Sequence, residues 1–293
     1  MKKQIYIILL CTLSTVLTGQ NLPSLLSGKN INSTFSILAF DEENKEWGIA
    51  VATDNIYVGN STIYIEPGIG AFSVIAETNP DYAINGFEKL KEGSTIKESI
   101  LFTKSEDDDA HYRQVSGIDA EGNVFAFTGE ALKYWNGKSG HLLKDKFVVM
   151  GNQLDESVLE AMASAFESTK GTLAQRLLVS LIEGQIAGGQ ITGKQSAALM
   201  TKGSDNEWFN QVDLRVDNSR HPFKELQTLL NYHYGRIYLN QSIYAIQEFG
   251  NETRAKEKLI EAENLLIEWN GMYGKMAFAN TLLGNEEKSI YWI

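Results

Sequence analysis

Two nearly continuous runs of apolar residues predict the first two strands of the chain. Residues 37–40 and 49–52 are apolar at almost every position, which is typical of strands covered on both faces. The polar residues 42–46 between them suit a hairpin loop. The hydroxyl-bearing residues Ser33, Thr34 and Ser36 stand where the first strand begins.

Downstream, the pattern alternates between strands and pairs of helices. Further strands are predicted over residues 60–66, 70–76, 114–119, 123–128, 146–150, 195–201 and 212–216. One helix pair starts at the N-cap Asn79 and at Ser94 or Thr95, with Ile84, Phe87 and Leu90 expected on a buried face. The other pair covers 156–167 and 172–186, with Thr172 and Gln175 spaced as a capping box. This order favours an α+β fold, a four-layer αββα sandwich of two antiparallel sheets, each covered by its own helices.

From residue 221 to the end at 293 the pattern becomes entirely helical. Helices are predicted over 222–247, 254–269 and 272–283. The triplet Gly-Asn-Glu at 250–252 recurs at a 34-residue offset, and Ala245 and Ala279 keep the same offset. This echo indicates a tetratricopeptide-like unit with a truncated second one. A plain helical bundle that caps a main domain at 34–218 is the alternative.

Residues 1–19 have the pattern of a secretory signal peptide, with Lys2 and Lys3 followed by an apolar stretch. The chain is therefore expected to be exported, to the periplasm or the medium; an uncleaved anchor is the alternative. Cys11, the single cysteine, lies inside this leader, so the mature chain would have no thiol chemistry. The formal net charge of −11 argues against a nucleic-acid partner and against membrane binding beyond the leader.

Short motifs spread over residues 34–217 resemble the DUF1028 family, which is placed among N-terminal-nucleophile hydrolase-like proteins. They are Thr34-Phe35-Ser36-Ile37, Gly48-Ile49-Ala50-Val51-Ala52, Gly68-Ile69-Gly70-Ala71, Asn79-Pro80 with Tyr82, Arg113-Gln114-Val115, Thr128-Gly129, Trp135, Gly151-Asn152, Ala161-Met162, Ala187-Gly188-Gly189, Gln195-Ser196-Ala197-Ala198-Leu199 and Asp213-Leu214-Arg215-Val216-Asp217. The resemblance implies the same αββα sandwich. Some family members carry an extra C-terminal module suspected of binding cell-wall material.

The resemblance implies that Thr34 would be the nucleophile, with a small amide or peptide as substrate. Such chemistry needs a free α-amine on the nucleophile, because the amine takes the hydroxyl proton and an amide nitrogen cannot. Residues 20–33, a linker or propeptide, would still block Thr34 after the leader is removed. Asp54 is a second catalytic candidate, at a strand end where its carboxylate could polarise a hydroxyl; a turn-forming role is the alternative.

Five further residues are candidates for binding a substrate, each with a structural alternative: Thr53, Glu77, Asn79, Arg113 and Asn152. Glu77 and Asn79 stand at a strand-to-helix junction with Asp81 nearby, where the acids Glu77 and Asp81 can instead complement the helix dipole. Arg113 could hold a carboxylate substrate, or pair structurally with Asp119 or Asp217. No spacing of histidines suggests a metal site, and no motif suggests a cofactor.

Four positions depart from the pattern of the family, which often has Gln at positions 75 and 150, Asp at 190 and Arg at 192. This chain has Ile75, Met150, Gln190 and Thr192 there. Two hypotheses therefore stay open: an exported amidohydrolase with Thr34 as nucleophile, and a non-catalytic binding or scaffold protein. In the second, residues 221–293 would bind a protein or cell-wall partner. A homo-oligomer is compatible with both.

Overall fold

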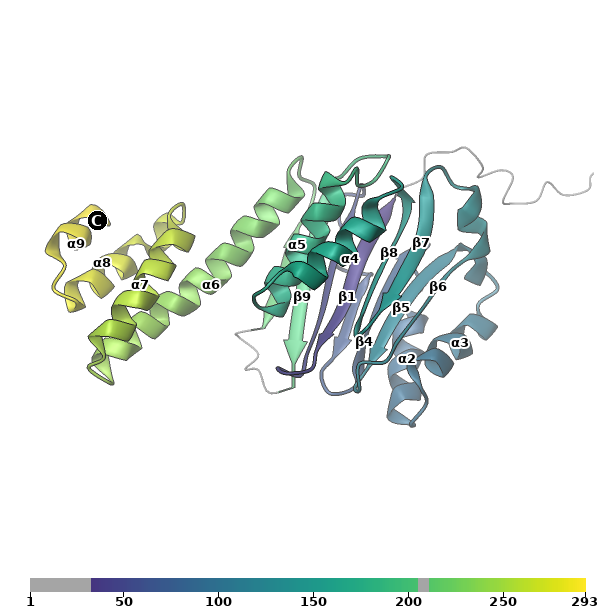
Figure 1. Cartoon of the computed structure of the whole chain (residues 1–293), viewed down its shortest axis with the longest axis horizontal. Helices are drawn as coiled ribbons and strands as arrows, with labels where there is room; N and C mark the ends of the chain where they lie inside the picture. The colour runs from purple at the N-terminus through teal and green to yellow at the C-terminus, as the bar shows by residue number, and fades with distance from the viewer. Residues whose placement is uncertain (1–32, 205–210) are drawn as a thin grey trace, which may run out of the picture.

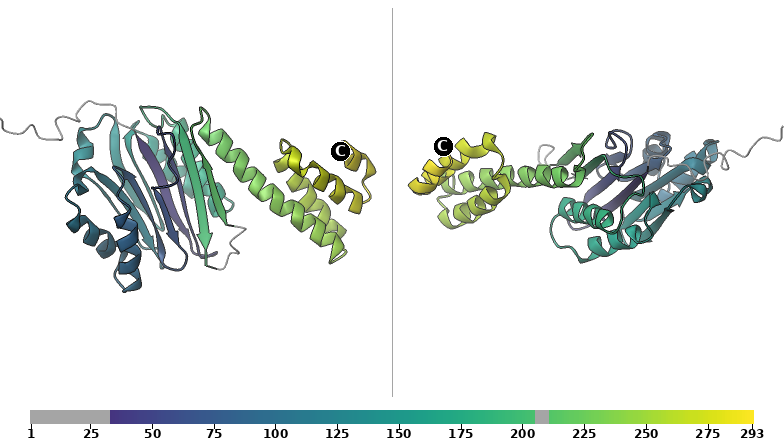
Figure 2. Two further views of the ribbon diagram at one scale, coloured as in Figure 1. Left: turned by 180° about the vertical axis from the view of Figure 1, so that it is seen from behind. Right: turned by 90° about the horizontal axis from the view of Figure 1, so that it is seen from above.

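The computed structural model describes residues 33–204 and 211–293 as a layered α+β fold followed by helices (Figure 1). The expected leader at 1–19, and the expected linker apart from Ser33, lie outside the described residues. Within the described ranges, a pair of antiparallel sheets face each other, and a helix pair covers the outer face of each (Figures 1 and 2). The predicted four-layer αββα sandwich is therefore confirmed.

The larger sheet, here called the β1 sheet, has the strand order β10-β9-β2-β1-β8-β7. Its strands are β1 (Thr34–Asp41), β2 (Glu46–Thr53), β7 (Lys138–Lys144), β8 (Phe147–Leu154), β9 (Ser196–Gly203) and β10 (Val212–Val216). Helices α4 (Val158–Ser168) and α5 (Leu173–Ile186) cover its outer face. The predicted capping box at the start of α5 is present, with Thr172 and Gln175 bonding reciprocally.

The smaller sheet, here called the β5 sheet, has the strand order β3-β4-β5-β6. Its strands are β3 (Ile63–Glu66), β4 (Gly70–Ala76), β5 (Arg113–Asp119) and β6 (Val124–Thr128). Helices α2 (Asp81–Lys91) and α3 (Ile96–Glu106) cover it, and α3 starts with a capping box at Thr95. Two short 3₁₀ turns, η1 (Ala110–Tyr112) and η2 (Glu130–Tyr134), connect its strands to their neighbours.

The alternation of side chains along β1 divides the core into two layers. Phe35, Ile37 and Ala39 belong to the apolar cluster under α4 and α5. Leu38 and Phe40 point the other way, into the cluster between the two sheets. Both faces of β1 are thus buried, as the continuous apolar run predicts. By the same alternation Thr34, two residues before Ser36 and four before Leu38, lies on the face between the sheets.

Three details of the sequence prediction are wrong. β7 was not predicted, because its polar sequence forms a half-buried edge strand without an apolar pattern. The strand expected from residue 60 begins at Ile63. Ile84 is 56% exposed instead of buried, because α2 packs through Tyr82, Ala83 and Gly86. A Cβ on Gly86 would lie 2.5 Å from the Phe72 ring, so the helix approaches the sheet at this glycine.

The C-terminal helices begin with α6 (Pro222–Gln247), which leads away from the sandwich to α7 (Glu252–Leu266), α8 (Tyr273–Leu282) and α9 (Glu286–Tyr291) (Figure 2). A 3₁₀ turn, η4 (Asn270–Met272), precedes α8. The start of α6 joins the core under the β1 sheet through Phe223, Leu226 and Leu230. The rest packs in a separate apolar cluster with α7, α8 and Trp292.

The Gly-Asn-Glu triplet that repeats at a 34-residue offset forms two helix-to-helix turns with the same conformation. Gly250 and Gly284 both have positive φ, of 59° and 70°. The following asparagines, Asn251 and Asn285, each accept a backbone N–H at the start of the next helix. The sequence echo therefore reflects a repeated turn, while the tetratricopeptide relation and the binding role of residues 221–293 stay predictions.

Candidate functional site

The register of the β1 sheet places Thr34 between two polar partners. Thr34 is paired with Thr53 on β2 and with Asn152 on β8. Directly opposed residues of antiparallel strands point to the same face. Accordingly, Thr34 Oγ1 donates to Thr53 Oγ1 at 3.1 Å, and the Thr34 backbone N–H donates to Asn152 Oδ1 at 3.1 Å. Both groups that the nucleophile hypothesis needs, the hydroxyl and the nitrogen of Thr34, are thus held by side chains.

The residue before Thr34 is held just as firmly. Ser33 is fully buried, and its backbone N–H donates to Asp54 Oδ1 at 2.9 Å. Its carbonyl oxygen accepts three hydrogen bonds: from Thr53 Oγ1 at 2.6 Å, from Gln190 Nε2, and from the Asp54 backbone N–H at 3.4 Å. Its hydroxyl contacts Gln190 and Thr192. The peptide bond between Ser33 and Thr34 therefore lies in a polar cage with three donors on its carbonyl oxygen.

A chain of buried amides supports the nitrogen side of Thr34. Asn152 Nδ2 donates to Gln114 Oε1 at 3.2 Å, and both residues are fully buried. Gln114 Nε2 donates to the carbonyls of Gly151 and Gly140 and to Thr128 Oγ1. The hydroxyl of Thr128 contacts His141 Nδ1 at 2.9 Å. Burial lowers the pKa of His141, so the neutral imidazole is favoured at the end of this chain.

A cavity of about 690 Å³ opens beside Thr34. Its lining comes from the ends of β1, β2 and β4, from the segment between β2 and β3, and from Trp135; the residues are Thr34, Thr53, Asn55, Ile56, Tyr57, Val58, Ser61, Thr62, Ile75, Ala76, Glu77, Thr78 and Trp135. Its volume lies within the range that small-molecule sites have. The cavity therefore gives a small ligand room next to the hydroxyl of Thr34.

Ala76 ends β4 at the wall of this cavity in an unusual conformation. Its φ is 69°, in the left-handed region that alanine rarely adopts. The following residue is fixed by its backbone: Glu77 N donates to the Tyr112 carbonyl at 3.3 Å, and the Glu77 carbonyl accepts from Arg113 Nη1 at 2.9 Å. A strained residue that persists next to a cavity is typical of functional sites.

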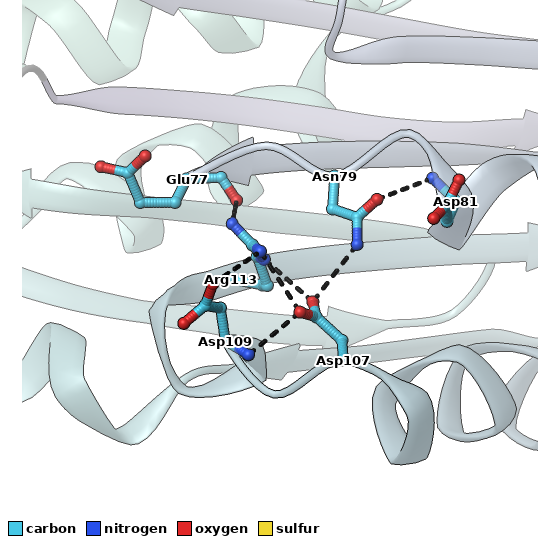
Figure 3. Close-up of polar contacts among 6 residues, drawn as sticks. All are labelled: Glu77, Asn79, Asp81, Asp107, Asp109 and Arg113. Atoms are coloured by element: carbon cyan, nitrogen blue, oxygen red, sulfur yellow. Dashed lines mark hydrogen bonds and ion pairs between the residues drawn. The ribbon is translucent and has the colours of Figure 1, made fainter.

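Below this junction, Arg113 is engaged in an ionic network (Figure 3). Its Nε and Nη2 donate to the two carboxylate oxygens of Asp107 at 2.9 and 3.2 Å, and Asp109 lies 3.8 Å away. The hydrogen bond from Arg113 holds the pKa of Asp107 below its usual range. Asn79 Nδ2 donates to Asp107, and Asn79 Oδ1 accepts from the Asp81 backbone N–H. The pairing of Arg113 with Asp119 or Asp217 is therefore wrong; its partner is Asp107.

The structure divides the candidate residues among three places. Thr34, Thr53 and Glu77 line the cavity. Asn152 lies behind Thr34, and Asp54 holds the N–H of Ser33. Asn79 and Arg113 belong to the ionic network. Sequence reasoning gave no role to Trp135, although the residue stands among the family motifs, because its segment has no strand or helix periodicity.

The four departures from the family pattern also fall near the site. Gln190 and Thr192 both contact Ser33, and Ile75 lines the cavity. Met150 packs between the sheets. Within residues 33–204 and 211–293, no group of three or more His, Cys, Asp or Glu side chains could hold a metal ion. No helix in these ranges is long and apolar enough to cross a membrane.

Fold and site together define an αββα sandwich protein in which a central strand begins with a threonine hydroxyl at a cavity. The model of a family described as being of unknown function, DUF1028, matches residues 34–226. The chain belongs to this family, as its motifs indicate. No curated protein matches the chain.

The chain is similar to several solved structures, of which three are described here. The crystal structure of protein SPO2555 from Silicibacter pomeroyi, described with the DUF1028 family, has a TM-score of 0.62 and 31% identity, covering 68% of this chain and 84% of that one. Anbu, an ancestral β-subunit from Yersinia bercovieri, has a TM-score of 0.34 and 12% identity. The match covers 72% of this chain and 96% of that one. An Anbu (Gly-1) mutant from Hyphomicrobium sp. strain MC1 also has a TM-score of 0.34 and 12% identity. The match covers 74% of this chain and 99% of that one.

Proposed function

We propose that this chain is an exported amidohydrolase of the N-terminal-nucleophile type. Thr34 becomes the nucleophile after the chain is cut between Ser33 and Thr34. The observation that carries the proposal is the cage around this peptide bond, in which three donors converge on the Ser33 carbonyl oxygen. Donors placed on a carbonyl oxygen stabilise the negative charge that develops there when the carbonyl carbon is attacked.

In the proposed cut, Thr34 Oγ1 attacks the carbonyl carbon of Ser33. A C–O bond forms, the C–N bond to Thr34 breaks, and the hydroxyl proton ends on the departing nitrogen. Water then hydrolyses the resulting ester, which leaves a carboxylate on Ser33 and restores the hydroxyl of Thr34. The contact of Thr34 Oγ1 with Thr53 Oγ1, and of Thr53 Oγ1 with the same carbonyl oxygen, supports this step.

The cut would create the base that substrate hydrolysis needs. A free α-amine has an ordinary pKa of about 7.7–8.0, so an appreciable fraction is neutral near pH 7 and can take the hydroxyl proton. The Asn152 side chain, which now accepts the Thr34 N–H at 3.1 Å, would keep the amine in place. The acyl group of a small amide or peptide would pass to Thr34 Oγ1, and water would then release it.

Two chains that both begin at Thr34, the first with a free α-amine and the second with this amine acetylated, test this function. An electrophilic lactone, which acylates an activated hydroxyl, is the probe, and mass spectrometry of the labelled peptide is the readout. We expect labelling of Thr34 in the first chain and none in the second, with Thr34→Ser partly active and Thr34→Val unlabelled. Equal labelling of both chains, or of neither, would contradict the proposal and favour a binding protein.

A further inference from the structure

The described lining of the cavity beside Thr34 contains an acidic side chain and no basic one. Among its lining residues in the described structure, Glu77 carries the one carboxylate, and the rest are hydroxyl, amide or apolar groups. Glu77 forms no ion pair among the described residues, and its side chain is exposed to solvent. A ligand in this cavity therefore meets a negative charge that no neighbouring cation neutralises.

Arg113 is a cation bonded to the backbone of Glu77, and it is turned away from the Glu77 carboxylate. Its guanidinium bonds to both carboxylate oxygens of Asp107 and to the backbone carbonyl of Glu77. Figure 3 shows the Glu77 carboxylate on the side away from Arg113. Arg113 is thus committed to Asp107 and is not free to hold a carboxylate of a substrate, while it fixes the backbone that carries Glu77.

A second observation concerns Trp135. Trp135 is among the lining residues and is only 4% exposed, and its buried indole Nε1 has no hydrogen-bond partner in the described structure. A buried N–H without an acceptor is unfavourable, so a ligand that brings an acceptor gains a full hydrogen bond there. Carbonyl oxygens of amides and peptides are such acceptors.

The cavity also has apolar side chains in its wall. Ile56 and Tyr57 line it and are 50% and 48% exposed, which is high for large apolar side chains. An apolar group of a ligand would cover them. The lining thus combines a carboxylate, an unsatisfied N–H donor and an exposed apolar surface.

From these three features we propose that the site selects amides or peptides that carry a protonated amine and an apolar group, and that it discriminates against carboxylates. Glu77 attracts the amine, and Trp135 Nε1 donates to a ligand carbonyl. The inference rests on the proposed function, because it takes this cavity as the substrate site. An exposed charge contact changes affinity by up to about fivefold, so attraction and repulsion together separate cationic from anionic ligands by about tenfold.

Binding is measured on the full chain with Thr34→Ala, in which no turnover takes place. The probes are three N-acetylated dipeptide amides with a C-terminal phenylalanine amide, carrying lysine, norleucine or glutamate at the first position. We expect affinity to fall in that order, with about tenfold between the lysyl and glutamyl probes at low salt. Glu77→Gln should bring these two probes within about twofold, and Glu77→Lys should reverse the order.

Two further variants separate the local contacts from the charge of the whole protein. Asp81→Asn removes an exposed carboxylate near the site that does not line the cavity, and should leave the order of the probes unchanged. Trp135→Phe keeps an aromatic ring but loses the N–H, and should weaken the norleucyl probe by about threefold to tenfold.

Equal affinities for the lysyl and glutamyl probes, a preference that survives Glu77→Gln, or no binding of the lysyl probe at millimolar concentration would each overturn the inference. The probe order is independent of hydrolysis. If Thr34 proves unreactive while the order holds, the catalytic proposal fails and the selectivity of the cavity stands.

Discussion

The two sides of the cavity hold their polar groups in different ways. On the β1 side, Ser33, Thr34 and Asn152 are buried, neutral and joined by hydrogen bonds. On the β4 side, Glu77 presents an exposed carboxylate, and its backbone carbonyl accepts a hydrogen bond from Arg113. Buried neutral groups define a position closely, because each unmade bond is costly, whereas an exposed charge attracts ligands of one sign. In the proposed function, the β1 side would therefore supply the chemistry and the β4 side the selection.

The buried side should be the more fragile one, and Asn152→Leu tests this. The variant leaves the Thr34 N–H and Gln114 Oε1 without their partner in the interior. We expect it to lower the free energy of unfolding by about 3 kcal/mol, because each orphaned group costs about 1–3 kcal/mol. Urea unfolding gives the value. The exposed Asn55 is the matched control, and Asn55→Ala should change stability by less than about 0.5 kcal/mol. If Asn152→Leu and Asn55→Ala changed the free energy of unfolding by similarly small amounts, the buried side would be no more sensitive than the exposed side.

The ion pair under the β4 side should contribute next most. Asp107→Asn should lower the free energy of unfolding by about 2 kcal/mol at pH 7, since it removes charge-assisted bonds to Arg113. Because Arg113 depresses the pKa of Asp107, this stabilisation is present above the unfolded-state pKa of about 3.9 and is lost as pH falls through the folded-state value. The difference between the two chains should thus vanish in acid. An exposed neighbour, Asp108→Asn, is the control, and a difference that persists at low pH would contradict the assignment.

The strain at Ala76 gives a smaller effect of opposite sign. Ala76→Gly should raise the free energy of unfolding by about 1 kcal/mol, because alanine is disfavoured in the left-handed region and glycine is not. Ala187, with a φ of −74°, is the matched control, and Ala187→Gly should destabilise the chain. Thermal unfolding compares the two. If both substitutions destabilise, Ala76 is not strained.

The smallest expected effect is the pH response of His141. Its pKa is lowered by burial, so the unfolded chain binds more protons below the unfolded-state pKa of about 6.5. Stability is therefore complete above about pH 6.5 and falls as pH decreases from there, by less than about 1.4 kcal/mol per pH unit. His141→Gln should flatten this slope between about pH 6.5 and 5 in urea titrations. Identical slopes in the two chains would show that the histidine is not buried in its neutral form.

The layered fold could be predicted because it depends on local patterns. The continuous apolar runs around Leu38 and the capping boxes at Thr95 and Thr172 are readable along the chain. The edge strand β7 and the exposure of Ile84 were missed, because polar edges and the packing of a glycine face depend on neighbours distant in the sequence.

The site was only partly predictable. Thr34 and Thr53 stand at strand ends, so the hairpin register brings them together. Gln190 reaches Ser33 from more than 150 residues away in the sequence, and nothing in the local pattern of either residue indicates the contact. The partner of Arg113 was misassigned for a different reason: Asp107 is close in sequence, but it lies in the acidic stretch 106–109, whose pattern is typical of a solvated loop.

The mass of the mature protein tests the central claim most directly. The full chain is expressed with its own N-terminal residues, purified, and measured intact by mass spectrometry beside Thr34→Val. We predict that the wild-type chain has the mass of residues 34–293, and that the variant keeps residues upstream of Thr34. A wild-type chain that also begins upstream of Thr34 would leave the threonine nitrogen as an amide and contradict the proposed chemistry.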